Sequence, residues 1–339
     1  MPDTYTSQFS GEEIDSALRA AQVISGASTP AELRDKLEIR GDTIPVSATD
    51  PTPVSEALTA SGGGVNPNLL DNWYFGRPVN QRGQMEYPSS NGLSYTIDRW
   101  TQNSSGVKIN DGYITVGGAG GIFERIENID LLVGKLLTFS VLTTDGLYTG
   151  TTTFSKEDHV FSSADNLLIL YNKYFNAFQI APSVAGATKN LLAAKLELGD
   201  QQTLAHKENG VWVLNEVPDY GEQLARCQRC AFSPLFEAYA TAVICNLFVS
   251  SAANGIAFGE VTLPVSMRSK PVFSGNASKF WIVAENGGGA SHPTAIAVMG
   301  LSADKVMIQV NGSYTANTQY ILYVENPFTS ADFLLSADL

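Results

Sequence analysis

The sequence predicts a mainly β protein that begins with two short helices. Three observations support this fold class: helical periodicity is confined to residues 1–41, short alternating apolar runs separated by Gly, Asn and Asp follow residue 66, and none of these runs is followed by a convincing long helix. The chain has 339 residues, of which 44% are hydrophobic and 16% charged. This composition provides enough core material for two or three modules.

The N-terminal segment, 1–41, carries two helix-start signals. Ser10-Gly11-Glu12-Glu13 has the form of a capping box and predicts a helix over 10–24. Thr29-Pro30-Ala31-Glu32 repeats the pattern, with an N-cap, a proline at the first helical position and a later glutamate, and this second helix ends near Gly41. The apolar stripes of the two helices contain Ile14 and Leu18 in the first and Leu33 and Leu37 in the second.

These stripes are only two turns long, and isolated helices of this length are marginal in water. The helices must therefore pack on something. Two arrangements remain open: the stripes meet copies of themselves or a neighbouring component, or the two helices pack on each other as a hairpin. We expect 1–41 to serve attachment and oligomerisation.

Residues 42–65 read as a linker, because Pro45, Pro51, Pro53 and the glycines at 62–64 discourage regular structure. Two β modules follow, over 66–226 and 227–339. Strands are expected around 113–116, 136–142, 167–171, 246–249, 259–263, 280–283, 305–310 and 320–324. A helical patch at 220–229 joins the two modules.

The net charge is −13, and most of the acidity lies before Gly64, where ten acidic residues face four basic ones. Binding to nucleic acid needs clustered Lys and Arg, so nucleic acid is not an expected partner. No run approaches the roughly 18 apolar residues of a membrane span, and no basic-then-apolar leader is present, so membrane insertion is not expected.

Cys227 and Cys230 form a C-x-x-C motif, and Cys245 is the third cysteine. A zinc site needs further Cys or His ligands nearby, and the three histidines are distant in sequence. We therefore interpret the thiols as structural and predict neither a metal site nor a cofactor. Whether a structural metal ion supports the first β module is left open.

Catalysis is not predicted. Asp71, Glu86 and Asp98 are irregularly spaced among turn residues, whereas glycoside hydrolysis needs two carboxylates across one cleft. A G-x-S-x-G motif is absent, and the glycine-rich 117–121 segment lacks the lysine of a phosphate-binding loop.

Sugar binding uses aromatic rings together with amide and carboxylate groups. Candidate ligand-binding residues in turn-rich segments are Tyr87, Tyr95, Tyr148, Tyr174 and Tyr314. For each tyrosine, the alternative is ordinary packing in the core or at the rim of a sandwich. Leu70, Trp73, Phe75 and Trp100 are assigned to the core.

Two sequence blocks resemble a known family. The opening block runs from Asn68-Leu69-Leu70-Asp71-Asn72-Trp73-Tyr74-Phe75 through Pro78-Val79-Asn80-Gln81-Arg82-Gly83 to Tyr95-Thr96-Ile97-Asp98-Arg99-Trp100. The closing block comprises Ala194-Lys195-Leu196-Glu197-Leu198-Gly199-Asp200 and Asp219-Tyr220-Gly221-Glu222-Gln223-Leu224-Ala225-Arg226-Cys227-Gln228-Arg229. They resemble the start and end of the galactose-binding-like, carbohydrate-binding-module-like jelly-roll of tail-fibre and receptor-binding proteins of tailed bacteriophages and prophages. In similar chains the closing block commonly ends Cys-Gln-Arg-Tyr-Tyr, whereas this chain has Cys230-Ala231 in place of the aromatic pair.

The resemblance implies a jelly-roll β-sandwich over 66–226 and a distal, receptor-contacting β-sandwich module over 227–339. It also implies a homotrimer in the phage tail of the virion, made in the cytoplasm of the bacterial host. Its 1–41 segment would bind tail or baseplate proteins, and its β domains would bind host surface polysaccharide without catalysis.

One alternative is a structural baseplate, tail or collar decoration protein that binds no receptor. A capsule-degrading depolymerase is disfavoured, because the chain is short and shows no repeat typical of a β-helix. The resemblance supplies no residue-level binding motif.

Overall fold

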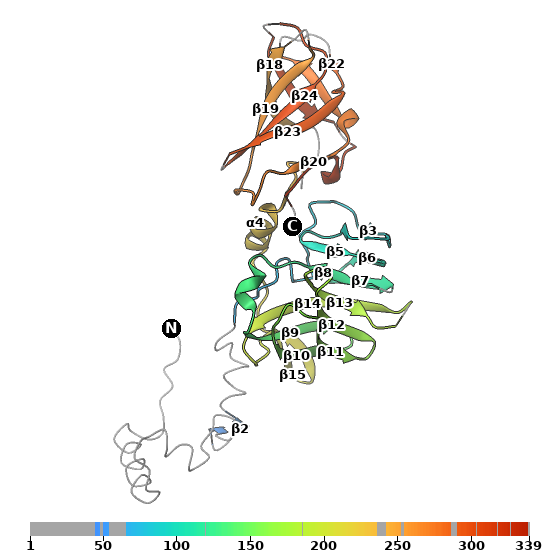
Figure 1. Cartoon of the computed structure of the whole chain (residues 1–339), viewed down its shortest axis with the longest axis vertical. Coiled ribbons are helices and arrows are strands. Elements are labelled where there is room, and N and C mark those ends of the chain that lie inside the picture. Colours follow the sequence, from blue (N-terminus) through green and yellow to red (C-terminus); the bar gives the residue numbers. More distant parts are fainter. Residues whose placement is uncertain are drawn as a thin grey trace, which may run out of the picture. The chain divides into compact units, whose positions relative to one another are not determined.

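The computed structural model describes residues 45–47, 50–53, 66–118, 120–184, 186–235, 242–251, 254–285, 290–302, 304–316, 318–325 and 327–337 (Figure 1). The chain divides into two compact units, Met1–Val65 and Asn66–Leu339. The expected helices at 10–24 and 29–40, with Ile14, Leu18, Leu33 and Leu37, lie outside the described residues. In the described part of the chain, no helix is long and apolar enough to cross a membrane.

The expected linker, 42–65, contains a short antiparallel hairpin. Its strands are β1 (Pro45–Ser47) and β2 (Asp50–Pro53), and Ser47 pairs with Asp50. Regular structure is therefore present where the prolines suggested little. Proline is tolerated in strands that use few ladder hydrogen bonds, as a two-stranded edge does.

The larger unit begins with a β-sandwich of two six-stranded antiparallel sheets, between which the chain crosses repeatedly. The first sheet has the order β10-β9-β14-β7-β6-β3, with bounds Leu147–Thr153, Leu136–Thr143, Thr188–Leu198, Tyr113–Gly118, Ser105–Asn110 and Glu86–Tyr87. The second has the order β11-β12-β13-β8-β5-β4, with bounds His159–Ala164, Leu167–Asn172, Ala177–Pro182, Ile122–Glu124, Trp100–Gln102 and Ser94–Tyr95.

Every second side chain along the strands points inward, and these side chains fill the space between the two sheets. In β12, for example, Leu167, Ile169 and Tyr171 are buried while their neighbours are half-buried, as a pleated strand with one inward face requires. The predicted core residues are all buried, and the rings of Phe75 and Trp100 meet edge to face at 5.2 Å. The predicted jelly-roll-type sandwich is thus confirmed at the level of the fold class.

Smaller elements complete this module. They are η1 (Ile129–Leu132), the hairpin β15 (Ala205–Glu208) and β16 (Val211–Leu214), and α4 (Tyr220–Gln228). The helix α4 matches the patch expected at 220–229. Its N-cap is Asp219, whose carboxylate accepts a hydrogen bond from the Glu222 N–H at 2.9 Å.

The C-terminal module contains a three-stranded sheet and a seven-stranded sheet, both antiparallel. The small sheet has the order β17-β26-β20, with bounds Ala231–Phe232, Phe333–Ser336 and Val272–Gly275. The large sheet has the order β22-β21-β25-β18-β19-β24-β23, with bounds Ala290–Ser291, Phe280–Ala284, Tyr320–Val324, Ala242–Ser251, Ile256–Thr262, Lys305–Asn311 and Ala295–Leu301. Two 3-10 turns, η2 (Ala277–Lys279) and η3 (Ser330–Asp332), join its strands.

One face of the seven-stranded sheet surrounds a second hydrophobic core, so the sheet curls. Three strands separate β21 from β24 in the sheet order. Even so, a Cβ on Gly312, directly after β24, would lie 2.3 Å from Ile282 Cδ1 of β21. The opposite face of the sheet remains on the outside and is available to other molecules.

The opening and closing sequence blocks meet in the sandwich. The Asn68 side chain donates to the Ala194 carbonyl at 2.9 Å and accepts from the Leu196 N–H at 3.1 Å, and the Leu69 N–H donates to the Leu196 carbonyl at 2.8 Å. The Asn68 side chain therefore makes the hydrogen bonds to β14 that the backbone of a neighbouring strand residue would make. The two blocks are thus parts of a single structural junction.

Replacing Asn68 with Ala should lower the free energy of unfolding by about 1–3 kcal/mol, because the Leu196 N–H loses its acceptor in a partly buried place. Chemical denaturation of the full chain, followed by tryptophan fluorescence, measures this. Asn66→Ala is the matched control. Its amide makes one exposed hydrogen bond, to the Leu198 carbonyl, and its loss should change stability by no more than about 0.5 kcal/mol. Equal effects of the two substitutions would contradict this role of Asn68.

Candidate functional site

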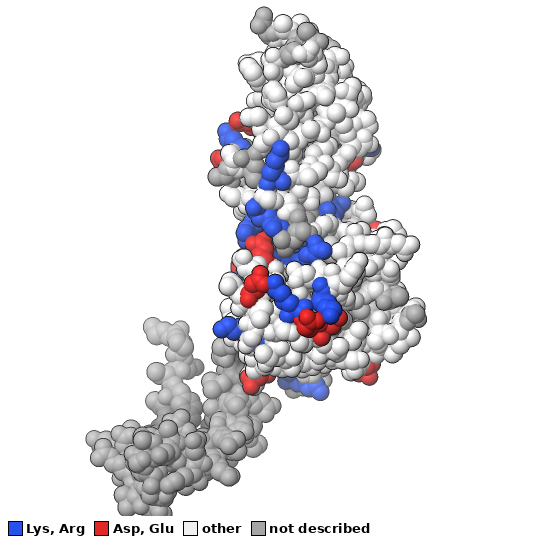
Figure 2. Space-filling view, viewed as in Figure 1, with Lys and Arg blue, Asp and Glu red and all other residues white. Residues whose placement is uncertain are grey.

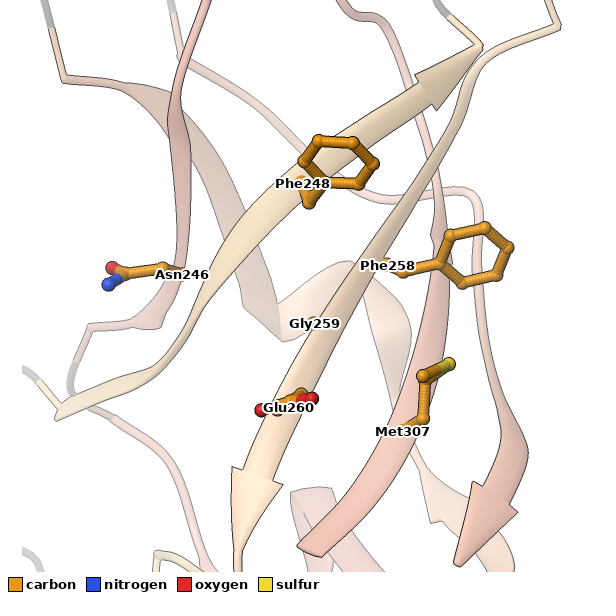
Figure 3. A pocket seen from close by; sticks show the side chains of 6 residues that line it. All are labelled: Asn246, Phe248, Phe258, Gly259, Glu260 and Met307. Atoms are coloured by element: carbon orange, nitrogen blue, oxygen red, sulfur yellow. The ribbon is translucent and has the colours of Figure 1, made fainter.

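A groove of about 500 Å³ lies on the outer face of the seven-stranded sheet (Figure 3). It crosses β18, β19 and β24. Its lining residues are Asn246, Phe248, Phe258, Gly259, Glu260 and Met307. The two phenylalanines are on adjacent strands, and Asn246, Glu260 and Met307 lie toward the other end of the groove (Figure 3).

Strand alternation explains why aromatic rings face outward here. In β18, Cys245 and Leu247 point into the core, so Phe248 points to solvent and is 75% exposed. The register then pairs Phe248 directly with Phe258 of β19. Side chains directly opposite each other on one face of a sheet are close neighbours, so the two rings form one apolar surface.

The backbone between the outward residues of β19 is bare. A Cβ on Gly259 would point inward and lie 2.5 Å from Cys245 Sγ, so the filled core excludes a side chain there. Phe258 and Glu260 therefore flank a strand position that has no side chain. The groove side of β19 therefore consists of the outward side chains of Phe258 and Glu260.

Polar groups border the apolar surface at one end. Asn246 is exposed, and the Glu260 carboxylate forms an ion pair with Lys305 Nζ at 2.8 Å. A smaller hollow of about 240 Å³ adjoins the groove and shares Glu260 and Met307 with it. Apolar rings thus lie beside an amide, a carboxylate and an ammonium group. This combination suits the flat apolar face and the hydroxyl edge of a sugar.

The sequence-predicted tyrosines do not form a site together. Tyr87 and Tyr148 are buried in the sandwich, and the Tyr87 hydroxyl is hydrogen-bonded to the Asn80 side chain. Burial also raises the pKa values of both phenols. These two residues pack in the core, which is the alternative that the sequence left open.

The other three tyrosines are distant from one another in the sequence, and each contacts different residues. The Arg82 guanidinium stacks over the half-buried Tyr95 at 4.5 Å. In the C-terminal module, the Tyr314 hydroxyl donates to the Val310 carbonyl at 2.9 Å. Tyr174 is 86% exposed at the turn between β12 and β13, and of the five it offers the most free ring surface.

Sequence reasoning missed the groove, although a signal was present. The run Cys245-Asn246-Leu247-Phe248 alternates, and assigning cysteine and leucine to the core places Asn246 and Phe248 together outside. The pairing with Phe258 depends on the register between β18 and β19, and the sequence does not give that register.

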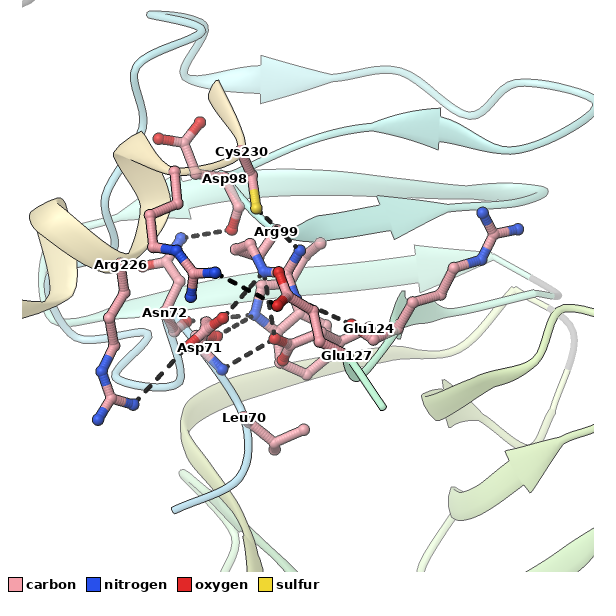
Figure 4. A network of polar contacts seen from close by, with 12 residues as sticks. Leu70, Asp71, Asn72, Asp98, Arg99, Glu124, Glu127, Arg226 and Cys230 are labelled. Atoms are coloured by element: carbon pink, nitrogen blue, oxygen red, sulfur yellow. Dashed lines mark hydrogen bonds and ion pairs between the residues drawn. The ribbon is translucent and has the colours of Figure 1, made fainter. Parts of the chain in front are cut away.

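The acids considered for hydrolysis do not face a cleft. Asp98 is fully buried, and its carboxylate accepts from the backbone N–H and side-chain amide of Gln81 at 3.2 and 2.9 Å. Asp71 belongs to the neighbouring network described next (Figure 4). Glu86 lies on the surface and pairs with Lys108. Asp71 and Asp98 therefore belong to polar networks within the protein, and Glu86 belongs to a surface ion pair.

Arg99 joins the opening block to the end of the closing block (Figure 4). Its guanidinium donates to Asp71 Oδ2 at 3.0 Å, to the Arg125 carbonyl at 2.9 Å and to Cys230 Sγ at 3.2 Å. The Glu124 carboxylate lies 3.8 Å away and is itself fully buried. Burial raises the pKa of Glu124 well above its usual range, although the charge of Arg99 acts in the opposite direction.

The cysteines are buried and form no disulfide. Burial raises the pKa of the Cys227 thiol well above its usual range, which opposes thiolate chemistry. Within the described ranges, no group of three or more His, Cys, Asp or Glu side chains could hold a metal ion.

Ser155 and His159 form a hydroxyl–imidazole pair. Ser155 Oγ lies 2.6 Å from His159 Nε2, and the Ser155 N–H donates to the same nitrogen at 3.1 Å. The imidazole thus accepts from the backbone of the loop that carries the hydroxyl. These bonds hold the loop before β11, and among the residues that the structure describes no third side chain is hydrogen-bonded to the His159 ring.

Comparison with known proteins found likeness only among solved structures. No protein-family model matches the chain, and no curated protein matches it either. Among solved structures, the N-terminal CBM22-1-CBM22-2 tandem domain of Paenibacillus barcinonensis Xyn10C aligns with 81% of this chain and 97% of its own length, at 8% identity and a TM-score of 0.21. This likeness is slight, and neither the fold nor the function of this chain follows from it.

The surroundings of Glu124 predict a pH dependence of stability. A folded-state pKa raised above the reference value of 4.5 means that folding favours the protonated acid. Its contribution is complete below about pH 4.5 and is lost as the pH rises through the raised pKa. Glu124→Gln is always neutral and keeps an oxygen that can accept from the Asp71 N–H. The Tm of this variant minus that of the wild type should therefore increase between about pH 4 and about pH 8.

Thermal melts of the full chain at a series of pH values measure this difference. Glu86→Gln on β3 is the matched control, and its Tm difference should stay small throughout, because exposed ion pairs contribute little to stability. A difference for Glu124→Gln that does not change with pH would show that this acid is not held in its protonated form.

Proposed function

We propose that this chain is a tail-fibre or receptor-binding subunit of a tailed bacteriophage, and that it adheres to a host surface glycan without catalysis. Residues 1–41 attach it to tail or baseplate proteins, and the β modules contact the host. The observation that carries the adhesive part of this proposal is the aromatic groove of Phe248 and Phe258, bordered by Asn246 and Glu260. The phage assignment rests on the two sequence blocks.

An outward-facing aromatic pair suits carbohydrate better than nucleic acid or a charged protein. Sugar rings stack on aromatic faces while amides and carboxylates bind their hydroxyls. On the face of the molecule in Figure 2, Lys and Arg lie interspersed with Asp and Glu, and the chain is acidic overall. A continuous basic track for a phosphate backbone is not seen on that face.

Weak sites are enough for a fibre that displays several copies. A shallow groove bound to one glycan segment gives modest affinity, but linked copies convert later contacts into intramolecular ones and raise the total affinity by orders of magnitude. A homotrimer displays three copies of the groove. The proposal therefore requires only a small binding energy from each groove.

Hydrolysis is not included in the proposal. Glu260 is the single acid among the residues that line the groove, and it is paired with Lys305. Retaining and inverting glycosidases use two carboxyl groups about 5–9.5 Å apart. An adhesin needs no such pair.

Phe248→Ala should lower binding of the full chain to surface glycan by roughly tenfold, about 1.4 kcal/mol, because it removes half of the stacking surface. Its Tm should not fall, since the ring is mostly exposed. Biolayer interferometry on immobilised lipopolysaccharide, capsule and teichoic-acid preparations, before and after periodate oxidation, measures the binding.

Tyr174→Ala removes another largely exposed aromatic ring, from the other module, and is the matched control. Glycan binding that Tyr174→Ala abolishes and Phe248→Ala spares would move the site to the jelly-roll. Absence of binding to every preparation by a folded chain would contradict the adhesin and favour the structural baseplate, tail or collar protein. Release of reducing sugar during the assay would contradict the non-catalytic part of the proposal.

A further inference from the structure

A second hollow, of about 260 Å³, lies in the jelly-roll module, where the loop of the opening block meets the start of α4. It shares no residue with the groove of Phe248 and Phe258. The side chains that matter to its chemistry are Asn72, Tyr74, Arg77, Asp219, Tyr220 and Gln223. We name this hollow the α4 pocket.

Contacts within the protein hold the walls of the α4 pocket in place. The Tyr74 ring lies against the backbone of Gly76, where a Cβ would come within 2.7 Å of the ring. The Arg77 guanidinium stacks over the Tyr220 ring at 4.3 Å. The Asn72 amide donates to two backbone carbonyls and accepts one N–H. These side chains are fixed before any ligand arrives, which reduces the entropy lost on binding.

Several polar groups of the α4 pocket can still form hydrogen bonds with a ligand. Gln223 is only 6% exposed, and its Oε1 has no hydrogen-bond partner among the described residues. The torsion that orients its amide is soft, so either end of the amide can turn toward the pocket. In that same part of the chain, the Arg77 side chain makes its stack with Tyr220 but no hydrogen bond or ion pair, and only Oδ1 of Asp219 caps α4.

A buried acceptor without a partner is costly, and native proteins retain few of them. Its presence inside a preformed pocket indicates that a donor from outside the chain completes it. We infer that the α4 pocket binds a single neutral sugar ring. A ring hydroxyl donates to Gln223 Oε1, further hydroxyls bridge Asp219 and Arg77, and the ring lies beside Tyr74.

Size and charge select this class of ligand. Drug-sized molecules occupy cavities of roughly 300–1,000 Å³, so about 260 Å³ suits one sugar ring and not a longer chain. Arg77 and Asp219 carry opposite charges, so the pocket favours a neutral ligand with donors and acceptors over a phosphate or a uronic acid.

This inference rests on the proposed function in one respect, namely that the chain is a glycan adhesin. It adds that the jelly-roll is a binding module and not only a spacer. Two independent subsites on one chain would also increase the number of contacts that each oligomer makes.

Saturation-transfer difference NMR of the full chain tests the inference. The probes are the methyl glycosides of glucose, galactose, mannose and N-acetylglucosamine, with methyl glucuronide as the acidic comparison. At least one neutral glycoside should give a signal, and Arg77→Ala should weaken its affinity at least tenfold. Lys207→Ala is the matched control, because Lys207 also stacks on a half-buried aromatic ring, that of Trp212, and its removal should leave the signal unchanged.

Gln223→Met separates binding from folding. It removes the unpartnered oxygen at nearly constant volume, so the Tm should stay the same or increase while the sugar signal is lost. A structural role for this amide would lower the Tm instead. Signals that Arg77→Ala and Gln223→Met leave intact would overturn the inference, as would binding of methyl glucuronide alone or no signal from any probe.

Phe248→Ala distinguishes this inference from the proposed groove. The variant should keep the methyl glycoside signal while losing polysaccharide binding. Loss of both in Phe248→Ala alone would place the monosaccharide in the groove and overturn the α4 pocket, whereas polysaccharide binding by Arg77→Ala leaves the adhesin standing.

Discussion

The buried guanidinium of Arg99 is the interaction on which the arrangement of the larger unit depends. It forms an ion pair with Asp71, lies 3.8 Å from the fully buried Glu124 carboxyl group and also donates to Cys230 Sγ, so it connects the first loop of the sandwich, strand β8 and the end of the closing block. Its own backbone has a φ of 73°, a left-handed conformation that a non-glycine residue adopts at a cost. Removing one partner of such a buried cluster leaves an uncompensated charge, typically worth 3–5 kcal/mol.

Polar contacts also connect the opening block to the C-terminal module. The Gln81 side-chain amide donates both to Asp98 and to the Ala231 carbonyl of β17, and the Glu127 carboxylate pairs with Arg229 and Arg268. These contacts lie beside Cys230-Ala231, where the two β modules join. Cys230 Sγ accepts a hydrogen bond from Arg99, and the Ala231 carbonyl accepts one from the Gln81 amide. The small residues therefore suit a junction made of hydrogen bonds instead of ring packing.

The sequence predicted what depends on local pattern and missed what depends on register. Alternation located β12 and β25, and the helical patch at 220–229 located α4. The Arg99 network joins residues 25 to 131 positions apart, so no local pattern could reveal it. The tyrosine candidates were chosen by residue type and turn context, but Tyr87 proved to face inward because the strand alternation decides exposure. The same alternation, applied to β18, would have identified Phe248.

An exposed Phe248 still has to be reconciled with the general tendency of aromatic rings to be buried. A stable contact between protein copies needs roughly 800 Å² from each partner, with an apolar centre. The groove instead meets polar groups at once, because Asn246 and Glu260 line it together with the rings and Glu260 is paired with Lys305 in the adjoining hollow. A flat protein surface could cover the two rings only by also desolvating the Glu260–Lys305 ion pair, which is costly. A narrow ligand that carries its own hydroxyl groups can stack on the rings and still satisfy these side chains, and for this reason the geometry favours a sugar over a second protein surface.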